Sequence, residues 1–302
     1  MVAKRLFAFV CLLALPVFAA WAGGIGSAKD FQAFVKAYNA GEDIKAWMRV
    51  DSVVVITSDL DFSKVKKLEQ ISAFSGVFDG QGHSIKGWKS QGGLFALVAE
   101  DGVVRNLVID AGCSAKLSPK SSGEFSFGFV ADVNEGMIID CSSAGKVSHK
   151  ASFAAADVFI GGLVGTNRNI MLRCTNSGKV SSDITAETKP EINIGVGGVA
   201  GGVAGKVLSC SSLTYCTNTG AVSLYTDAAN YFVGGVEGLC GANTMKYCVN
   251  RGPVKAESRF PEDGKPYIGH VGGIAGQAKG DMLRCGNYGD VTASGSGGAS
   301  DG

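Results

Sequence analysis

One motif recurs five times along this 302-residue chain and constrains its fold more than any other feature. The clearest copy, GGLVGTNRNIMLRCTNSGKV, spans residues 161–180. In every copy a cysteine stands six residues before a closing valine, and four copies open on Gly-Gly. The cysteines are Cys141, Cys174, Cys216, Cys248 and Cys285, at intervals of 33, 42, 32 and 37 residues. Self-similarity at such a period is typical of solenoids, in which each repeat is covered only by its neighbours.

Each copy contains three short runs of β-forming residues separated by turns rich in asparagine and glycine. In the clearest copy the runs are IGGLVG, IMLRC and KVSSDI, and the turns are TNRN and TNSG. Three such strands joined by tight turns make one coil, whose apolar side only an adjacent coil can cover. We therefore predict an all-β fold, a right-handed parallel β-helix (a solenoid) of roughly six to seven coils over residues 51–293.

Stacking of the coils in register would align equivalent residues into ladders. The five repeat cysteines would form one inward ladder, and the asparagines two residues after them a second one at a turn. These asparagines are Asn176, Asn218, Asn250 and Asn287. Adjacent strands lie about 4.8 Å apart, whereas a relaxed disulfide needs Cβ atoms about 3.8 Å apart. We therefore expect buried free thiols, with Cys210–Cys216 and Cys240–Cys248 left open as disulfide pairs.

The two ends of the chain differ from the repeats. Residues 1–22 have the basic start, apolar run and small residues of a secretory signal peptide, which predicts a secreted, cell-surface or periplasmic protein. Residues 23–50 form a lead-in, where Ser27 and an apolar stripe from Phe31 predict an amphipathic helix over 27–41 that caps the first coil. Residues 294–302 are predicted to be a polar flexible tail. No later apolar run is long enough to span a membrane.

The repeat resembles the GLUG motif of exported bacterial proteins, with its paired glycines, apolar residues and Cys-x-Asn-x-Gly-x-Val ending. The upstream runs SVVVITSDLDFS (52–63) and GVFDGQGHSIKGW (76–88) are similar to the first coils of pectin-lyase-like β-helices that carry such repeats. The likeness spans about residues 27–293. It implies the fold but no single activity, because these repeats occur in adhesins, in surface proteins and beside the protease domain of immunoglobulin A1 metallopeptidases. The His-Glu-x-x-His motif of that protease domain is absent here.

Composition and spacing disfavour several kinds of chemistry. The formal net charge is +1, so nothing favours a nucleic-acid partner. The run GGVAGGVAGK (197–206) lacks the Ser or Thr that follows the lysine of a phosphate-binding loop. The three histidines are scattered and no Cys-x-x-Cys pair is present, so we predict neither a metal site nor a cofactor.

A catalytic site is not predicted, although enzymatic activity stays open. The outward position before each ladder cysteine would have to supply the carboxylate cluster that a β-helix polysaccharide hydrolase needs. It holds instead Asp140, Arg173, Tyr215, Tyr247 and Arg284, which is a mixed column. Three other aspartates, Asp59, Asp61 and Asp79, are closer together in the sequence, but the resemblance implies that they belong to framework turns and strands.

The segments between the repeats carry aromatic and charged residues that suit a sugar or protein ligand. We expect them on one side of the solenoid, and the candidate ligand-binding residues are Phe153, Tyr225, Tyr231, Arg259, Phe260, Asp263 and Tyr267. The alternative is that their aromatic side chains fold back onto the coils. The predicted function is that of an adhesin-like protein whose partner is a glycan or a surface protein. The alternatives are a carbohydrate-active enzyme, either a polysaccharide lyase or a hydrolase, and a structural spacer in a larger surface protein. An uncapped last coil would also allow oligomers.

Overall fold

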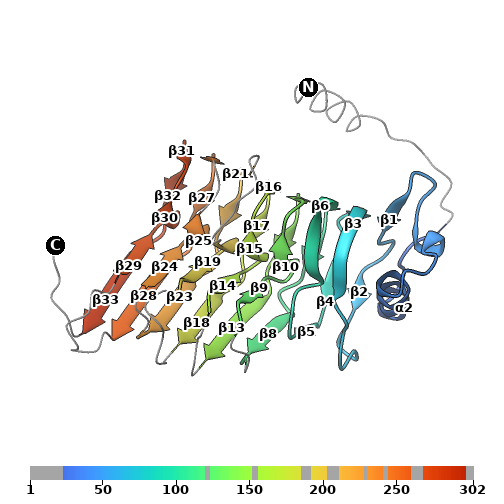
Figure 1. Ribbon diagram of the computed structural model, residues 1–302, viewed down its shortest axis with the longest axis horizontal. Helices are drawn as coiled ribbons and strands as arrows, with labels where there is room; N and C mark the ends of the chain where they lie inside the picture. Colours follow the sequence, from blue (N-terminus) through green and yellow to red (C-terminus); the bar gives the residue numbers. More distant parts are fainter. Residues whose placement is uncertain are drawn as a thin grey trace.

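A computed structural model describes residues 23–119, 123–151, 156–184, 192–202, 211–227, 230–240, 244–259 and 268–296. Over these residues the chain winds into one elongated stack of strands, with helix α2 (Ala28–Asn39) near one end and strand β33 (Val291–Ser296) at the other (Figure 1). The predicted parallel β-solenoid with a short N-terminal helix is confirmed. The predicted signal peptide and residues 297–302 of the predicted tail lie outside the described residues.

Five coils of the described chain each contain five short strands in the same order. The first has β9 (Phe125–Phe127), β10 (Ala131–Asn134), β11 (Met137–Ile139), β12 (Ser142–Ser143) and β13 (Lys146–Ala151). The second has β14 (Val158–Gly161), β15 (Val164–Asn167), β16 (Ile170–Leu172), β17 (Thr175–Asn176) and β18 (Val180–Ile184). The third has β19 (Ile194–Gly197), β20 (Ala200–Gly202), β21 (Ser212–Thr214), β22 (Thr217–Asn218) and β23 (Val222–Thr226). The fourth has β24 (Asn230–Gly234), β25 (Glu237–Cys240), β26 (Thr244–Lys246), β27 (Val249–Asn250) and β28 (Val254–Arg259). The fifth has β29 (Ile268–Gly272), β30 (Ala275–Ala278), β31 (Asp281–Leu283), β32 (Gly286–Asn287) and β33.

Equivalent strands of successive coils pair in parallel and form four sheets along the stack. The register is that of the sequence motif. The closing valines of the five copies are all partners in one series, Val147, Val180, Val222, Val254 and Val291. Each inward side chain therefore lies on the equivalent side chain of the next coil, as the motif predicts.

The segment before these five coils is less regular. It contains η2 (Lys45–Trp47), β1 (Val53–Val55), β2 (Leu60–Asp61), β3 (Ile71–Asp79), β4 (Ser84–Lys86), β5 (Lys89–Ser90), β6 (Phe95–Arg105), β7 (Val108–Ile109) and β8 (Ser114–Leu117). Strand β6 pairs with both β10 and β11, so one long strand stands where a repeat coil has two. Val98 of β6 lies opposite Asn134, whose side chain makes a turn by accepting a hydrogen bond from the Gly136 N–H at 3.2 Å. Valine cannot make this turn, and the described residues contain about five repeat coils rather than six to seven.

Helix α2 closes the core at the N-terminal end. The Ser27 Oγ caps the helix by accepting a hydrogen bond from the Asp30 N–H at 3.1 Å. Phe31 and Phe34 are fully buried, and their ring centroids lie 6.4 and 6.1 Å from that of Phe78 in β3. The amphipathic stripe of this helix therefore packs directly on the first long strand.

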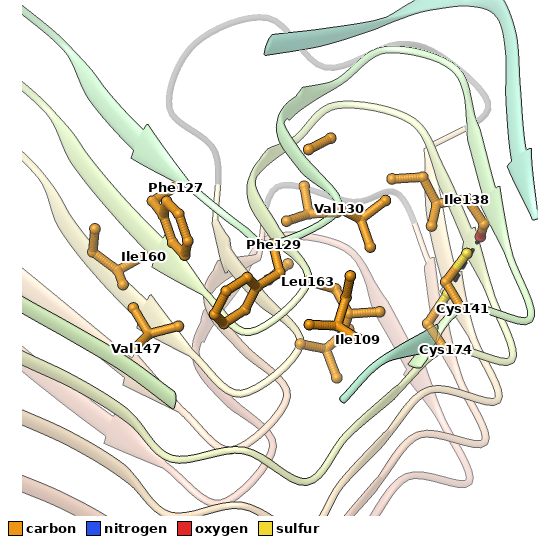
Figure 2. Close-up of a cluster of buried hydrophobic side chains, with 14 of the residues drawn as sticks. Ile109, Phe127, Phe129, Val130, Ile138, Cys141, Val147, Ile160, Leu163 and Cys174 are labelled. Carbon is orange, nitrogen blue, oxygen red and sulfur yellow. Dashed lines mark hydrogen bonds between the residues drawn. The ribbon is translucent and has the colours of Figure 1, made fainter. Parts of the chain in front are cut away.

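The interior of the coils contains stacked aliphatic, aromatic and thiol side chains. Figure 2 shows Cys141 and Cys174 beside each other at one side of this core, next to Ile138. The Cys174 thiol donates to the Ile138 carbonyl oxygen at 3.4 Å, and burial raises the pKa of Cys141 to about 12. All seven described cysteines are thiols, so Cys240 and Cys248 form no disulfide, while Cys210 lies outside the described residues. Buried thiols of raised pKa act here as small apolar side chains.

The asparagine ladder joins the coils at one turn. Successive side-chain amides donate to one another, from Asn176 to Asn218 at 2.8 Å, from Asn218 to Asn250 at 2.8 Å and from Asn250 to Asn287 at 2.7 Å. Each also donates to a carbonyl two residues later, as Asn218 does to the Gly220 oxygen at 2.7 Å. The Gly-Gly opening faces this ladder, because a Cβ added at Gly198 would overlap the Asn218 side chain. The Gly-Gly opening of the motif therefore leaves the space that the ladder asparagine occupies.

The fifth coil has the same interior side chains, but no further coil covers them within the described residues. Met245 and Val254 of the fourth coil are each 1% exposed, whereas Met282 and Val291 of the fifth are 45% and 42% exposed. Apolar side chains and the unpaired edges of β29 to β33 are therefore accessible at this end. Such an edge is what another coil or another chain would cover.

Replacing Asn218 by alanine should lower the free energy of unfolding by about 2–4 kcal/mol. The change leaves the Asn176 amide and the Gly220 carbonyl buried without their partner. Urea denaturation followed by circular dichroism measures the loss. Asn287→Ala is the matched control, since Asn287 is exposed and has one ladder neighbour among the described residues, and should cost less than about 1 kcal/mol. Equal losses in both variants would contradict a stabilising role for the buried ladder.

Candidate ligand-binding face

A column of outward side chains follows one corner of the solenoid. In each coil the chain turns between its third and fourth strands through one non-glycine residue of left-handed backbone conformation. We call these residues the corner column: Asp140 (φ 53°), Arg173 (φ 52°), Tyr215 (φ 55°), Tyr247 (φ 54°) and Arg284 (φ 52°). This conformation costs an L-residue about 1 kcal/mol or more, which glycine would avoid. The corner side chains point outward because the cysteine that follows each of them points into the core.

The corner column divides into an ion pair and an aromatic stack. Arg173 donates from Nε and Nη2 to the two carboxylate oxygens of Asp140 at 2.6 and 2.7 Å. Tyr215 and Tyr247 stack with ring centroids 4.8 Å apart and planes 7° apart, and Tyr215 is 53% exposed. The Arg284 guanidinium carbon lies 5.9 Å from the Tyr247 ring centroid. The exposed rings therefore stack at the distance that separates successive coils.

A second arginine–tyrosine pair lies on the same side of the fourth and fifth coils. The Arg251 guanidinium carbon is 4.9 Å from the ring centroid of Tyr288, which is 71% exposed. The Tyr288 ring folds back over Gly286, since a Cβ added there would lie 3.1 Å from Tyr288 Cε2 and 3.3 Å from its hydroxyl oxygen. The ring therefore lies beside Gly286, which is two residues after Arg284 in the chain. We call Tyr215, Tyr247, Arg251, Arg284 and Tyr288 the aromatic–arginine patch.

Two of the five residues of this patch were missed from the sequence. The corner residues were recognised as an outward column but were considered only as a source of carboxylates. Arg251 and Tyr288 were not predicted at all. The signal that could have found them is their position directly after the ladder asparagines Asn250 and Asn287, which alternation along a strand places outward.

The structure separates the residues that were predicted to bind a ligand. Tyr225 and Arg259 meet on the sheet that contains β23 and β28, where the guanidinium carbon lies 4.8 Å from the ring centroid. Tyr231 belongs to the core and is 5% exposed, which corrects the expectation that it lies on a surface. The reason is register, because Tyr231 pairs with the core residue Ile194. The other predicted residues, Phe153, Phe260, Asp263 and Tyr267, lie outside the described residues.

Titratable groups in the interior are buried rather than assembled around a substrate site. Glu237 is fully buried, and neither carboxyl oxygen has a hydrogen-bond partner of normal geometry among the described residues. Burial raises the pKa of Glu237 to about 8, an effect that the Cys240 thiol only partly offsets. Burial lowers the pKa of His149 to about 4, and its Nδ1 lies 2.9 Å from the Ser182 hydroxyl oxygen. Neither group reaches solvent, so neither can exchange a proton with an external substrate.

The three aspartates of the first coils are engaged by local neighbours. Asp59 pairs with Lys86 at 2.7 Å, and Asp79 pairs with Arg105 at 2.9 Å. Asp61 accepts a hydrogen bond from the backbone N–H of Ser63 at 2.8 Å. Across the described ranges, no three His, Cys, Asp or Glu side chains gather in a way that could hold a metal ion. Nor does any helix in those ranges have the length and apolar character needed to cross a bilayer.

The architecture is similar to that of a known crystal structure, that of a "putative immunoglobulin A1 protease" from Bacteroides ovatus. The TM-score is 0.59 at 15% sequence identity, over 90% of this chain and 83% of that one. At this identity the likeness is one of fold alone. No protein-family model matches the chain, so the GLUG resemblance is not confirmed, and no curated protein matches it in sequence.

Replacing Glu237 by glutamine should flatten the dependence of stability on pH. The folded protein holds this carboxyl at a pKa of about 8 against an ordinary value of 4.5, so the unfolded chain loses the proton first as pH rises. The stabilising contribution is therefore complete below about pH 4.5 and is lost, by a few kcal/mol, as pH rises to about 8. Urea unfolding between about pH 5 and pH 8 measures this slope. Parallel wild-type and Glu237→Gln curves would show that burial does not perturb the group.

Proposed function

We propose that this protein is an exported, adhesin-like binding protein that holds a glycan against the outer face of its solenoid. The observation that carries the proposal is the exposed stack of Tyr215 and Tyr247 at left-handed corners. Glycine would relieve the backbone strain at these positions, and neither side chain contributes to the core. Large side chains that cost backbone energy and face solvent are better explained by what they contact outside the protein.

Binding fits the patch better than catalysis does. The patch consists of phenol rings, phenol hydroxyls and guanidinium groups, and it contains no carboxylate that could act as a general acid or base. Asp140, the acidic member of the corner column, is held by both guanidinium bonds of Arg173. Protease activity does not transfer from the structural neighbour, because His-Glu-x-x-His is absent from the sequence.

Two further features support display at a cell surface. The first 22 residues have the pattern of a signal peptide, which accounts for export. The stacked coils form an elongated body whose side faces are reachable along its length (Figure 1). The pair formed by Tyr225 and Arg259 lies on another sheet of the same body and therefore provides a comparison outside the tyrosine stack.

A glycan array probed with residues 23–302 tests the proposal. The wild-type chain should bind a subset of glycans, and Tyr215→Ala with Tyr247→Ala should weaken that binding about tenfold or more, because an aromatic contact and its hydroxyls are lost. Tyr225→Ala is the matched control on the other sheet and should leave binding within about twofold. Loss of binding in the Tyr225 variant alone would move the site to that sheet. The absence of any glycan binding by the wild-type chain would refute the proposal.

Tyr215→Gly should leave the free energy of unfolding within about 1 kcal/mol of the wild type. The lost ring stacking, about 0.5–1.5 kcal/mol, is offset by relief of the left-handed strain. Thermal unfolding measured beside the array separates an effect on binding from an effect on folding. A large loss of stability would show that Tyr215 supports the coil rather than a ligand.

A further inference from the structure

The ring faces of the tyrosine stack are largely occupied. Tyr215 and Tyr247 cover each other's inner faces, and Arg284 lies over the remaining face of Tyr247. A sugar that packs flat on the Tyr247 ring would have to displace one of these contacts. The distal edges of the rings stay open, and each carries a hydroxyl with no hydrogen-bond partner among the described residues. The stack therefore offers donors to a ligand more readily than it offers aromatic faces.

The arginines of the patch differ from most of those elsewhere in the described chain, although Arg259 likewise lies over a ring, that of Tyr225. Four others make ion pairs: Arg49 with Asp51, Arg105 with Asp79, Arg168 with Glu135 and Arg173 with Asp140. Arg251 and Arg284 make no ion pair within the described residues, and each lies over a tyrosine ring instead. A guanidinium held by a ring keeps its N–H donors free to point outward. Both positive charges of the patch are thus available to an anion.

Neighbouring charges do not cancel this excess. The side chains that flank the patch on its own strands and turns are Lys246 and Lys279, which are cationic, and Asp281 and Asp290, which are anionic. None of the four forms an ion pair with a patch residue within 4.0 Å in the described chain. The local balance is therefore positive by the two patch arginines, on a protein whose overall formal charge is +1.

We propose that the aromatic–arginine patch binds an acidic polysaccharide, with the tyrosine hydroxyls and arginine N–H groups donating to its carboxylate or sulfate oxygens. This inference rests on the proposed glycan-binding function and specifies its ligand class. The donors recur coil by coil, about 4.8 Å apart along the stack, which suits a polymer that carries anions at intervals. Outward side chains of an extended peptide recur at about 6.8 Å, twice the rise per residue, and match this spacing less well. Charge-assisted hydrogen bonds to oxyanions are strong and directional, so few of them are needed.

Titration calorimetry of residues 23–302 with four polymers tests this inference. The probes are polygalacturonate (carboxylated), dextran sulfate (sulfated), neutral dextran and poly-glutamate. At least one acidic polysaccharide should bind, dextran should not, and the affinity should fall as salt rises. Comparison of the carboxylated and sulfated polymers identifies which oxyanion the patch prefers.

Two sets of variants locate the binding. Arg251→Gln with Arg284→Gln should weaken it about tenfold or more, and Tyr215→Phe with Tyr247→Phe, which keeps the ring stack, should weaken it about threefold or more. The matched control is Lys116→Gln with Lys146→Gln. It removes the same charge from exposed residues of β8 and β13, which make no ion pair in the described chain, and should change affinity less than about twofold. An equal loss in the control would show non-specific charge attraction and overturn the inference.

The remaining outcomes separate the two proposals. If neutral glycans bind as tightly as acidic ones and the patch variants weaken both, the proposed function stands and the acidic ligand is refuted. If poly-glutamate binds as tightly as the polysaccharides, the patch recognises acidic peptides and the inference fails. If no glycan binds in either this titration or the array, both proposals fail.

Discussion

The buried chain of amide–amide hydrogen bonds from Asn176 to Asn287 sets the register on which the rest of the structure depends. Asn218 and Asn250 each donate to the next amide and accept from the previous one, so a coil displaced by one residue would leave two neighbours unsatisfied in the interior. Glycine is required opposite each amide, because a Cβ at Gly198 would overlap the Asn218 side chain. The repeated motif therefore reflects one packing requirement, which is that each ladder asparagine faces a glycine and bonds to the asparagines of adjacent coils.

The ionisable side chains of the interior occupy positions that this register fixes. The ladder thiols interact with their neighbours, and the contact with Cys174 together with burial raises the pKa of Cys216 well above its ordinary value. Glu237 stands in register between Ala200 and Ala275, where the neighbouring coils have small apolar side chains. The stack tolerates a protonated carboxyl there because the many contacts above and below hold the coil in place. Only side chains at outward positions can therefore contact molecules in the solvent.

Much of the fold could be predicted from the sequence because the motif repeats what stacking requires. The cysteine and asparagine spacing predicted the strands, the register and both ladders, and the Ser27 cap with its apolar stripe predicted helix α2. The number of coils was overestimated, because the segment before the five regular coils is less regular and β6 stands there as one strand where later coils have two. Tyr231 was misplaced because a short strand flanked by loops does not reveal which face is buried until its partner Ile194 is known.

The candidate site was less predictable than the fold for a physical reason. Alternation indicates that Tyr215 and Tyr247 point outward, but not that their rings lie parallel and cover each other. The Tyr288 ring lies close over Gly286, where a Cβ would be in tight contact with it. The contacts of Tyr215 with Tyr247 and of Arg251 with Tyr288 join residues more than 30 positions apart in the chain, and only the three-dimensional stack brings them together.

The left-handed corner has a consequence for how such a protein can change. Its backbone geometry is imposed by the coil, while its side chain contributes nothing to the interior, so aspartate, arginine and tyrosine all occupy it without altering the fold. Each coil therefore contributes one outward corner residue that can be exchanged without altering the coil, although it contacts the corner residue of the adjacent coil. Under the proposed binding function an added coil would add one contact, and attachment to a long polymer would then grow with valency rather than with the affinity of any single contact.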